Sequence, residues 1–164
     1  LFRSQILTIG VVFLAIMAMF LVLFRSLKIA FVAILPSMLA SGSVLGLMGW
    51  LSIPLDVMTI TIAAICIGIG VDHSIHYIHR FRSEIKQQAS ARIAIEKSHA
   101  STGKAIYYTS VIIVVGFSIL GLSNFIPTIY FGVFTAFAML ISLIANLTLL
   151  PLLLLGINSG KIKT

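Results

Sequence analysis

One acidic side chain, that of Asp72, lies deep within a hydrophobic run of the sequence, and histidines follow it at short spacing. A carboxylate at the centre of a membrane helix costs about 2.5–3.5 kcal/mol on insertion-based scales, and such residues are generally kept for a function. Desolvation penalises the charged form of a carboxyl group, so a group of this kind can load and unload a proton as helices move. A structural acid that fixes helix packing is the alternative; the position favours the proton carrier.

The histidines near Asp72 fall on two faces of the expected helix. At about 100° per residue, Asp72, His76 and His79 share one narrow stripe, whereas His73 points away from it. The stripe is compatible with metal ligands on one helix face. However, His79 adjoins Arg80, and a cation disfavours a divalent metal. We therefore expect no metal site, and His73 either relays a proton or bonds a neighbouring helix.

Two hydroxyl side chains are expected at the same depth as Asp72. Asp72 is six residues before Ile78, which places it about 9 Å in from one end of its helix. Thr109 and Ser110 are four and five residues into a later span that begins near Ala105 on the same side. These positions predict a buried polar site. The expected proton-relay residues are Asp72, His73, His76, Thr109 and Ser110.

The composition is that of an integral membrane protein. Of its 164 residues, 60% are hydrophobic and 9% are charged, whereas soluble domains carry about 25% charged residues. The net charge is +7, but the cations cluster in short loops between hydrophobic spans. That pattern is typical of topology signals and head-group contacts. We therefore expect membrane lipids, and no nucleic acid, among the partners.

The hydrophobic pattern predicts an all-α fold, a polytopic membrane helix bundle of five transmembrane helices. A spanning helix needs about 20 largely apolar residues. Residues 105–160 carry no charge, and as one helix of about 84 Å they are too long for a single crossing. Ser123, Asn124 and Pro127 therefore indicate a break. The expected spans are residues 6–24, 29–51, 57–78, 105–122 and 128–155.

One longer polar region, residues 80–104, separates the third and fourth spans. Apolar residues recur there at intervals of four, which predicts one amphipathic helix on the cytoplasmic side. They are Phe81, Ile85, Ala89 and Ile93. Glu84 within this region is expected to pair with a nearby cation, a contact worth little in stability.

Small residues in the second and third spans are expected to let other helices approach closely. They are Gly42, Gly46, Gly68 and Gly70. The last two resemble a dinucleotide-binding loop only superficially, because no strand precedes them and the third glycine is absent. Helix packing is the better interpretation.

The cations indicate an orientation. Those in residues 25–28, 80–104 and 161–163 fall on one side of a five-span chain, and the opposite loops hold none. The positive-inside rule then places the N-terminus outside and the C-terminus in the cytoplasm. An outside start at Leu1, rather than at a methionine, predicts that an earlier helix and an external domain are missing.

The stretch GIGVDHSIHYIHRFRSE, residues 68–84, resembles the fourth-helix signature of one half of the resistance-nodulation-division (RND) superfamily, in its MMPL-type branch. The matching positions are Gly68, Gly70, Asp72, Ile75, His76, Arg80, Phe81, Arg82 and Glu84. The likeness extends over nearly the whole chain, for example to Thr109-Ser110 and Gly116-Phe117. His73 stands where the family usually has tyrosine.

The resemblance implies a proton-driven secondary transporter, not an enzyme, built from two similar halves in a bacterial inner membrane. This chain would supply the last five helices of the C-terminal half, with Asp72 as the proton-relay acid. No cofactor is implied beyond the proton gradient. The implied partners are membrane lipids, a hydrophobic or lipid-like exported substrate, and the missing N-terminal half and external domains; whether the protein forms an oligomer is left open.

Two other functions are compatible with the sequence. One is a sterol-sensing-type regulatory or structural membrane module without proton coupling. The other is a protein-export accessory subunit, whose fourth helix has a similar acid and R-x-R-x-E pattern. In those subunits the two residues after the acid are usually Ala or Gly and then Asn, whereas in this chain they are His73 and Ser74. The accessory subunit therefore ranks lower.

Overall fold

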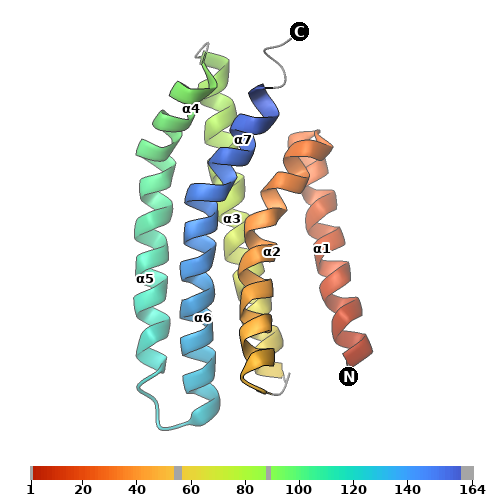
Figure 1. Ribbon diagram of the computed structural model, residues 1–164, viewed down its shortest axis with the longest axis vertical. Helices are drawn as coiled ribbons and strands as arrows, with labels where there is room; N and C mark the ends of the chain where they lie inside the picture. Colours follow the sequence, from red (N-terminus) through yellow and green to blue (C-terminus); the bar gives the residue numbers. More distant parts are fainter. Residues whose placement is uncertain (1, 54–56, 88–89, 160–164) are drawn as a thin grey trace.

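The computed structural model describes residues 2–53, 57–87 and 90–159, which form a bundle of helices (Figure 1). In chain order the elements are α1 (Phe2–Phe24), α2 (Leu27–Trp50), α3 (Val57–Gln87), α4 (Ala91–Ser98), the π-helix η1 (His99–Gly103), α5 (Lys104–Leu120), α6 (Ile126–Ile144), the π-helix η2 (Ala145–Leu149) and α7 (Leu150–Ser159). No strand occurs in these described ranges. The predicted all-α membrane bundle is confirmed.

Within the described ranges, four helical segments are long and apolar enough to cross a membrane. They are Leu27–Trp50, Ile60–Gln87, Ala91–Leu120 and Ile126–Ile157. In α1 the apolar part is shorter and runs over Gly10–Phe24. Two of these segments continue through a π-helix, because α4, η1 and α5 follow one another without a break, as do α6, η2 and α7.

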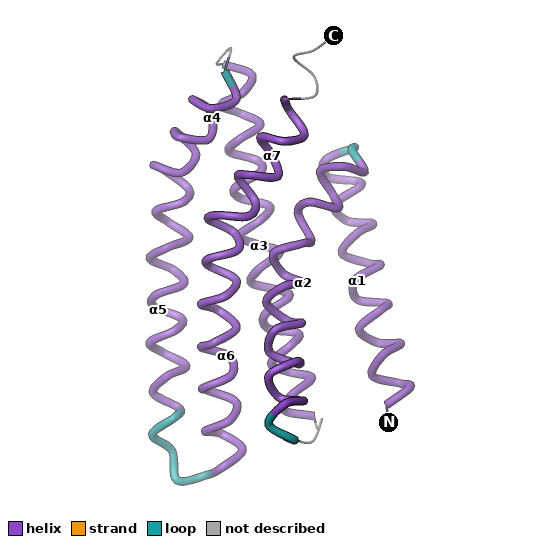
Figure 2. The backbone as a smooth tube through the Cα atoms, in the orientation of Figure 1, coloured by secondary structure: helices purple, strands orange, loops and turns teal. Residues whose placement is uncertain are grey.

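Local sequence explains where the helices end. Arg25 adopts φ 50°, and its N–H donates to the Leu21 carbonyl at 2.9 Å, so a left-handed residue caps α1. The break expected near Ser123 lies between α5 and α6. Pro127 is in the first turn of α6, where its missing N–H leaves no helical bond unmade. Figure 2 places the α1–α2 turn at one end of the bundle and the α5–α6 loop at the other.

The structure divides residues 80–104 differently from the single amphipathic helix that the sequence predicts. The first part continues α3 as far as Gln87, and the second part begins at Ala91 as α4. Phe81 of α3 and Ala94 of α4 are both buried in the same core cluster. The two helices pack against each other, and α4 also packs against α7, so this region forms two helices joined to the bundle.

The core lies where α2, α3 and α6 meet. One cluster of buried side chains, which includes Phe20 and Tyr77, fills the end where the basic loops gather. A second cluster, which includes Met48 and Met139, fills the other end. Because lipid tails are as apolar as leucine, such contacts stabilise a membrane bundle through van der Waals packing and hydrogen bonds between helices.

The four glycines expected at helix contacts occupy two kinds of place. A Cβ atom on Gly70 would lie 2.7 Å from Ser37 Oγ and 3.1 Å from Ser142 Oγ, so α2 and α6 both approach α3 closely there. Gly42, Gly46 and Gly68 have no other atom within 4 Å of the Cβ position. A packing role for these three glycines stays a prediction, because no described residue of this chain packs against them.

Gly132 marks a close helix contact that the sequence analysis missed. A Cβ atom there would lie 2.5 Å from the Phe117 carbonyl oxygen and 2.6 Å from Leu120 Cβ. Both neighbours belong to α5, and the first is backbone. The absence of a side chain at Gly132 therefore lets α6 lie directly against α5, the helix that carries Thr109.

Candidate functional site

Asp72 lies in α3 and points out of the bundle of this chain. Its side chain is 65% exposed, and that of His76, one turn later, is 68% exposed. Asp72 Oδ1 and His76 Nε2 are 3.4 Å apart, so the two groups form an ion pair when the histidine is protonated. The contact follows from their i,i+4 spacing, which places both side chains on one helix face.

An open cavity of about 550 Å³ lies beside this pair, between α3 and the helix formed by η1 and α5. Polar side chains from both walls line it, and they are Asp72, His73, His76, His79, Arg80, Ser101, Thr102 and Thr109. Four of the five predicted relay residues are thus brought to one cavity. Ser110 is the one that does not line it.

Thr109 and Ser110 are separated by the geometry of α5. Successive residues on a helix point about 100° apart. Thr109 is exposed and lines the cavity, whereas Ser110 is fully buried. Within the described part of the chain, Ser110 Oγ has no hydrogen-bond partner. Depth was inferred from the sequence for both residues, but their direction was not.

His73 is the buried member of the set, with 5% of its surface exposed. Its Nδ1 atom is enclosed, and none of the described residues offers it a hydrogen bond. A buried polar atom without a partner is costly and is often satisfied by water or tied to function. His73 therefore brings an unused hydrogen-bonding atom to the residue next to Asp72.

The metal alternative on Asp72, His76 and His79 finds no structural support. In the ranges that the structure describes, no group of three or more His, Cys, Asp or Glu side chains is arranged to hold a metal ion. Arg80, which also lines the cavity, pairs with Glu84 at 2.6 Å, and the Glu84 side chain is only 7% exposed. That contact holds a guanidinium at the basic end of the cavity.

A buried polar cluster at the junction of α3, α6 and η2 was missed by the sequence analysis. Ser74 Oγ donates to Asn146 Oδ1 at 2.9 Å, and Asn146 Nδ2 donates to the Ser142 carbonyl at 2.9 Å. All three residues are fully buried. The available signal was Asn146 itself, the one amide in an uncharged segment of more than twenty residues whose other polar side chains are hydroxyls, because a polar group there needs partners.

Comparison with known proteins agrees with this architecture. The model of the MMPL family matches residues 1–160 of the chain. MJ1562 of Methanocaldococcus jannaschii is 32% identical over 152 residues, which cover 93% of this chain and 39% of that protein. YdgH of Bacillus subtilis is 30% identical over 148 residues, which cover 87% of this chain and 17% of that protein. The names of both describe membrane proteins.

The chain therefore spans well under half the length of these relatives. No solved structure matches it. The resemblance carried by residues 68–84 is confirmed by the family match, and membership indicates an RND-type membrane transporter or module. This chain, with its helical bundle and its cavity beside Asp72, belongs to the MMPL family.

Proposed function

We propose that this chain is the membrane half of a proton-motive-force-driven RND/MMPL-type exporter that moves hydrophobic or lipid-like substrates. The observation that carries the proposal is the cavity in which Asp72 faces His76 at 3.4 Å, with Thr109 on the opposite wall. An acid, an imidazole and a hydroxyl within a membrane-spanning segment are the groups that a proton relay needs. The exporter role and the substrate class come from the family resemblance.

In this mechanism the Asp72 carboxylate accepts the proton. The His76 imidazole, one turn away, exchanges protons with it, and His79 continues the same face toward the basic end. The buried Nδ1 of His73 offers a second acceptor or donor beside the acid. Protonation of Asp72 removes its attraction for a protonated His76, so loading changes the contacts between the cavity walls and links proton uptake to helix movement.

The exposed cavity supports a partner at this face. An acid and a histidine that are about two-thirds exposed within a span are costly against lipid, so another protein surface is needed to cover them. We assign that surface to the other membrane half of the same transporter. The external domains, the bacterial inner membrane, and an orientation with the N-terminus outside complete the proposal.

Transport by the complete protein in liposomes with an imposed pH gradient tests the mechanism. Asp72→Asn keeps the shape of the side chain but removes its titration, and we expect gradient-driven transport to fall to the level of protein-free liposomes. Asp56→Asn makes the same chemical change just before the predicted third span and serves as the matched control. Unchanged transport with unchanged pH dependence in Asp72→Asn would contradict the proposal and favour a regulatory module without proton coupling.

A further inference from the structure

A second polar surface lies away from Asp72, where α4, η1 and α5 pack beside η2 and α7. One open cavity of about 630 Å³ is lined by Arg92, Glu96 and Leu152, among others. Another, of about 350 Å³, is lined by Lys104. The two adjoin, because His99 and Leu147 line both. We call them together the interfacial groove.

The two π-helices form the walls of this groove. A Cβ atom on Gly103 of η1 would lie 3.6 Å from Leu147 Cδ2 of η2, so the two wide turns are in contact. Isolated π-helical turns inside α-helices are rare and occur frequently at functional sites. The contact between two such turns therefore makes this part of the bundle a candidate functional site.

Helix lengths place the groove at the membrane surface. About 20 residues cross the apolar core. Counted from Ile126, that length reaches Ala145, and counted back from Leu120 it reaches Ser101. His99 and Leu147 therefore lie near the level where acyl chains give way to head groups, at the end of the bundle where the basic loops gather.

The charges of the groove fit a phosphate. Arg92 lies seven residues before His99 and Lys104 lies five residues after it, which is about 10 Å and about 8 Å along the helix axis. The two cations therefore stand on either side of the imidazole along this wall. Glu96 is the one acid among the described lining residues, which leaves a net charge of +1 with a neutral histidine. The floor is apolar, with Leu147 and Leu152 along it.

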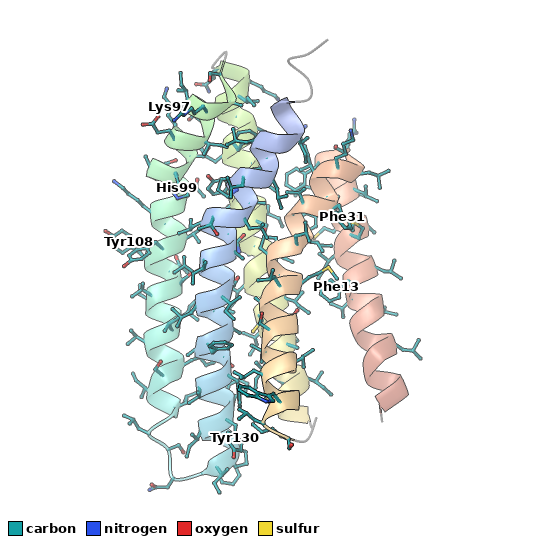
Figure 3. All side chains as sticks on the ribbon, in the orientation of Figure 1. Phe13, Phe31, Lys97, His99, Tyr108 and Tyr130 are labelled. Carbon is teal, nitrogen blue, oxygen red and sulfur yellow. The ribbon has the colours of Figure 1, made fainter. Side chains whose placement is uncertain are left out.

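A buried hydrogen bond orients the central histidine. The hydroxyl of Tyr77, a fully buried residue, lies 3.0 Å from His99 Nδ1. When Tyr77 donates to Nδ1, the neutral ring carries its proton on Nε2, the nitrogen left for the groove. His99 lies between Lys97 and Tyr108 along this wall (Figure 3). The groove thus offers an oriented N–H donor between two cations.

We propose that the interfacial groove binds one anionic phospholipid from the leaflet at the basic end. Its phosphate accepts from His99 and pairs with Lys104, whose side chain leans back toward His99 along the helix. Arg92, at the other end of the wall, attracts the anionic head group from the aqueous side, while the acyl chains lie along Leu147 and Leu152. The site is separate from the Asp72 cavity and does not depend on proton-coupled transport.

The binding of a fluorescent phosphatidylglycerol by the purified complete protein in detergent tests this site. We expect tighter binding of this probe than of a phosphatidylcholine with the same acyl chains. Arg92→Gln and Lys104→Gln should each weaken binding about fivefold, as expected for the loss of one cation near an anionic head group. Lys97→Gln, which removes a neighbouring cation that lines neither cavity, is the matched control and should leave binding unchanged.

A gain-of-binding variant separates this site from loss of folding. Glu96→Gln removes the acid of the groove and should tighten phosphatidylglycerol binding about threefold, which a misfolded protein would not do. Weaker binding by Glu96→Gln overturns the proposal, because it would show that the acid holds an amine head group. Equal affinity for the two lipids, or an effect of Lys97→Gln as large as that of Lys104→Gln, also overturns it.

Discussion

The hydroxyl of Tyr77 and Nδ1 of His99 lie 3.0 Å apart and connect the helix of Asp72 to the wall of the interfacial groove. The two rings meet edge to face, with centroids 5.9 Å apart and planes at 81°. Tyr77 is fully buried, five residues after Asp72 on α3. One hydrogen bond and one ring contact therefore join α3 to the wall of the interfacial groove.

Loss of this hydroxyl is expected to destabilise the bundle. Tyr77→Phe keeps the ring packing but removes one hydrogen bond, which costs about 0.5–1.5 kcal/mol. The melting temperature of the purified protein in detergent measures the effect. Tyr130→Phe, at a position that is 45% exposed, is the control and should change it little. Equal melting temperatures for the two variants would show that the bond adds nothing to stability.

The close contact at Gly132 predicts a strong effect of a single methyl group. Gly132→Ala places Cβ against the Phe117 carbonyl and Leu120 Cβ, atoms that cannot rotate away. Overpacking of this kind costs about 1–3 kcal/mol and forces α5 and α6 apart. Gly116→Ala, where no other atom lies within 4 Å of the Cβ position, should instead gain up to about 1 kcal/mol of helix propensity.

Thermal unfolding of the two glycine variants in detergent compares them directly. The same melting temperature in both would contradict the contact at Gly132. An inserted cysteine pair across the two helices gives a second measurement, because its crosslinking yield should fall in Gly132→Ala and stay the same in Gly116→Ala.

The cluster around Asn146 predicts measurable coupling between two helices. Asn146→Ala removes the amide that accepts from Ser74, whose hydroxyl keeps the Gly70 carbonyl at 3.0 Å as its acceptor. The loss of this hydrogen bond should destabilise the protein by about 0.5–1.5 kcal/mol. A double-mutant cycle with Ser74→Ala should give an interaction energy of about 0.6 kcal/mol, the mean for hydrogen bonds between membrane helices. Strictly additive effects on unfolding would show that the two side chains do not interact.

The sequence was sufficient for those features that depend on local chemistry. Pro127 and its polar neighbours predicted the break before α6, and the i,i+4 spacing of Asp72 and His76 predicted their shared face. These features can be predicted without knowing which helices are neighbours in the bundle.

Features that depend on helix neighbours were not predictable from one sequence. Spans such as α5 are apolar on nearly every side, so the hydrophobic pattern does not tell which face packs on α6 and which face lines the cavity beside α3. That is why Thr109 and Ser110 were given the same role, and why Gly132 was not singled out. The π-helix around Asn146 has no local sequence signal that separates it from an α-helix.

The different directions of Thr109 and Ser110 predict different effects of removing each hydroxyl. Thr109→Val removes a hydroxyl from the wall of the cavity. In the proposed relay this hydroxyl contributes one hydrogen bond, worth about 1 kcal/mol, so gradient-driven transport should fall about fivefold. Ser110→Ala removes a buried hydroxyl without a partner in the described structure, so transport should stay the same and the melting temperature should stay level or rise. A larger transport defect in Ser110→Ala than in Thr109→Val would reverse this assignment.

Arg82 anchors α1 to α3, and its removal should loosen α1 locally. Its Nη1 donates to the Phe24 carbonyl at 3.1 Å, and its guanidinium lies 5.8 Å from the centre of the Phe24 ring. The bond satisfies a free carbonyl at the end of α1, and a charged donor makes it worth about 1.5–3 kcal/mol.

Arg82→Gln should therefore speed amide hydrogen exchange in the last turn of α1 by about 10-fold, because local opening there becomes easier. Lys86→Gln removes an exposed cation one turn later on α3 and is the matched control. In Figure 1, α1 meets the rest of the bundle at this end and diverges from it toward its N-terminus. Unchanged exchange in Arg82→Gln would mean that the apolar packing of α1, which includes Phe20 and Phe24, is enough to hold it in place.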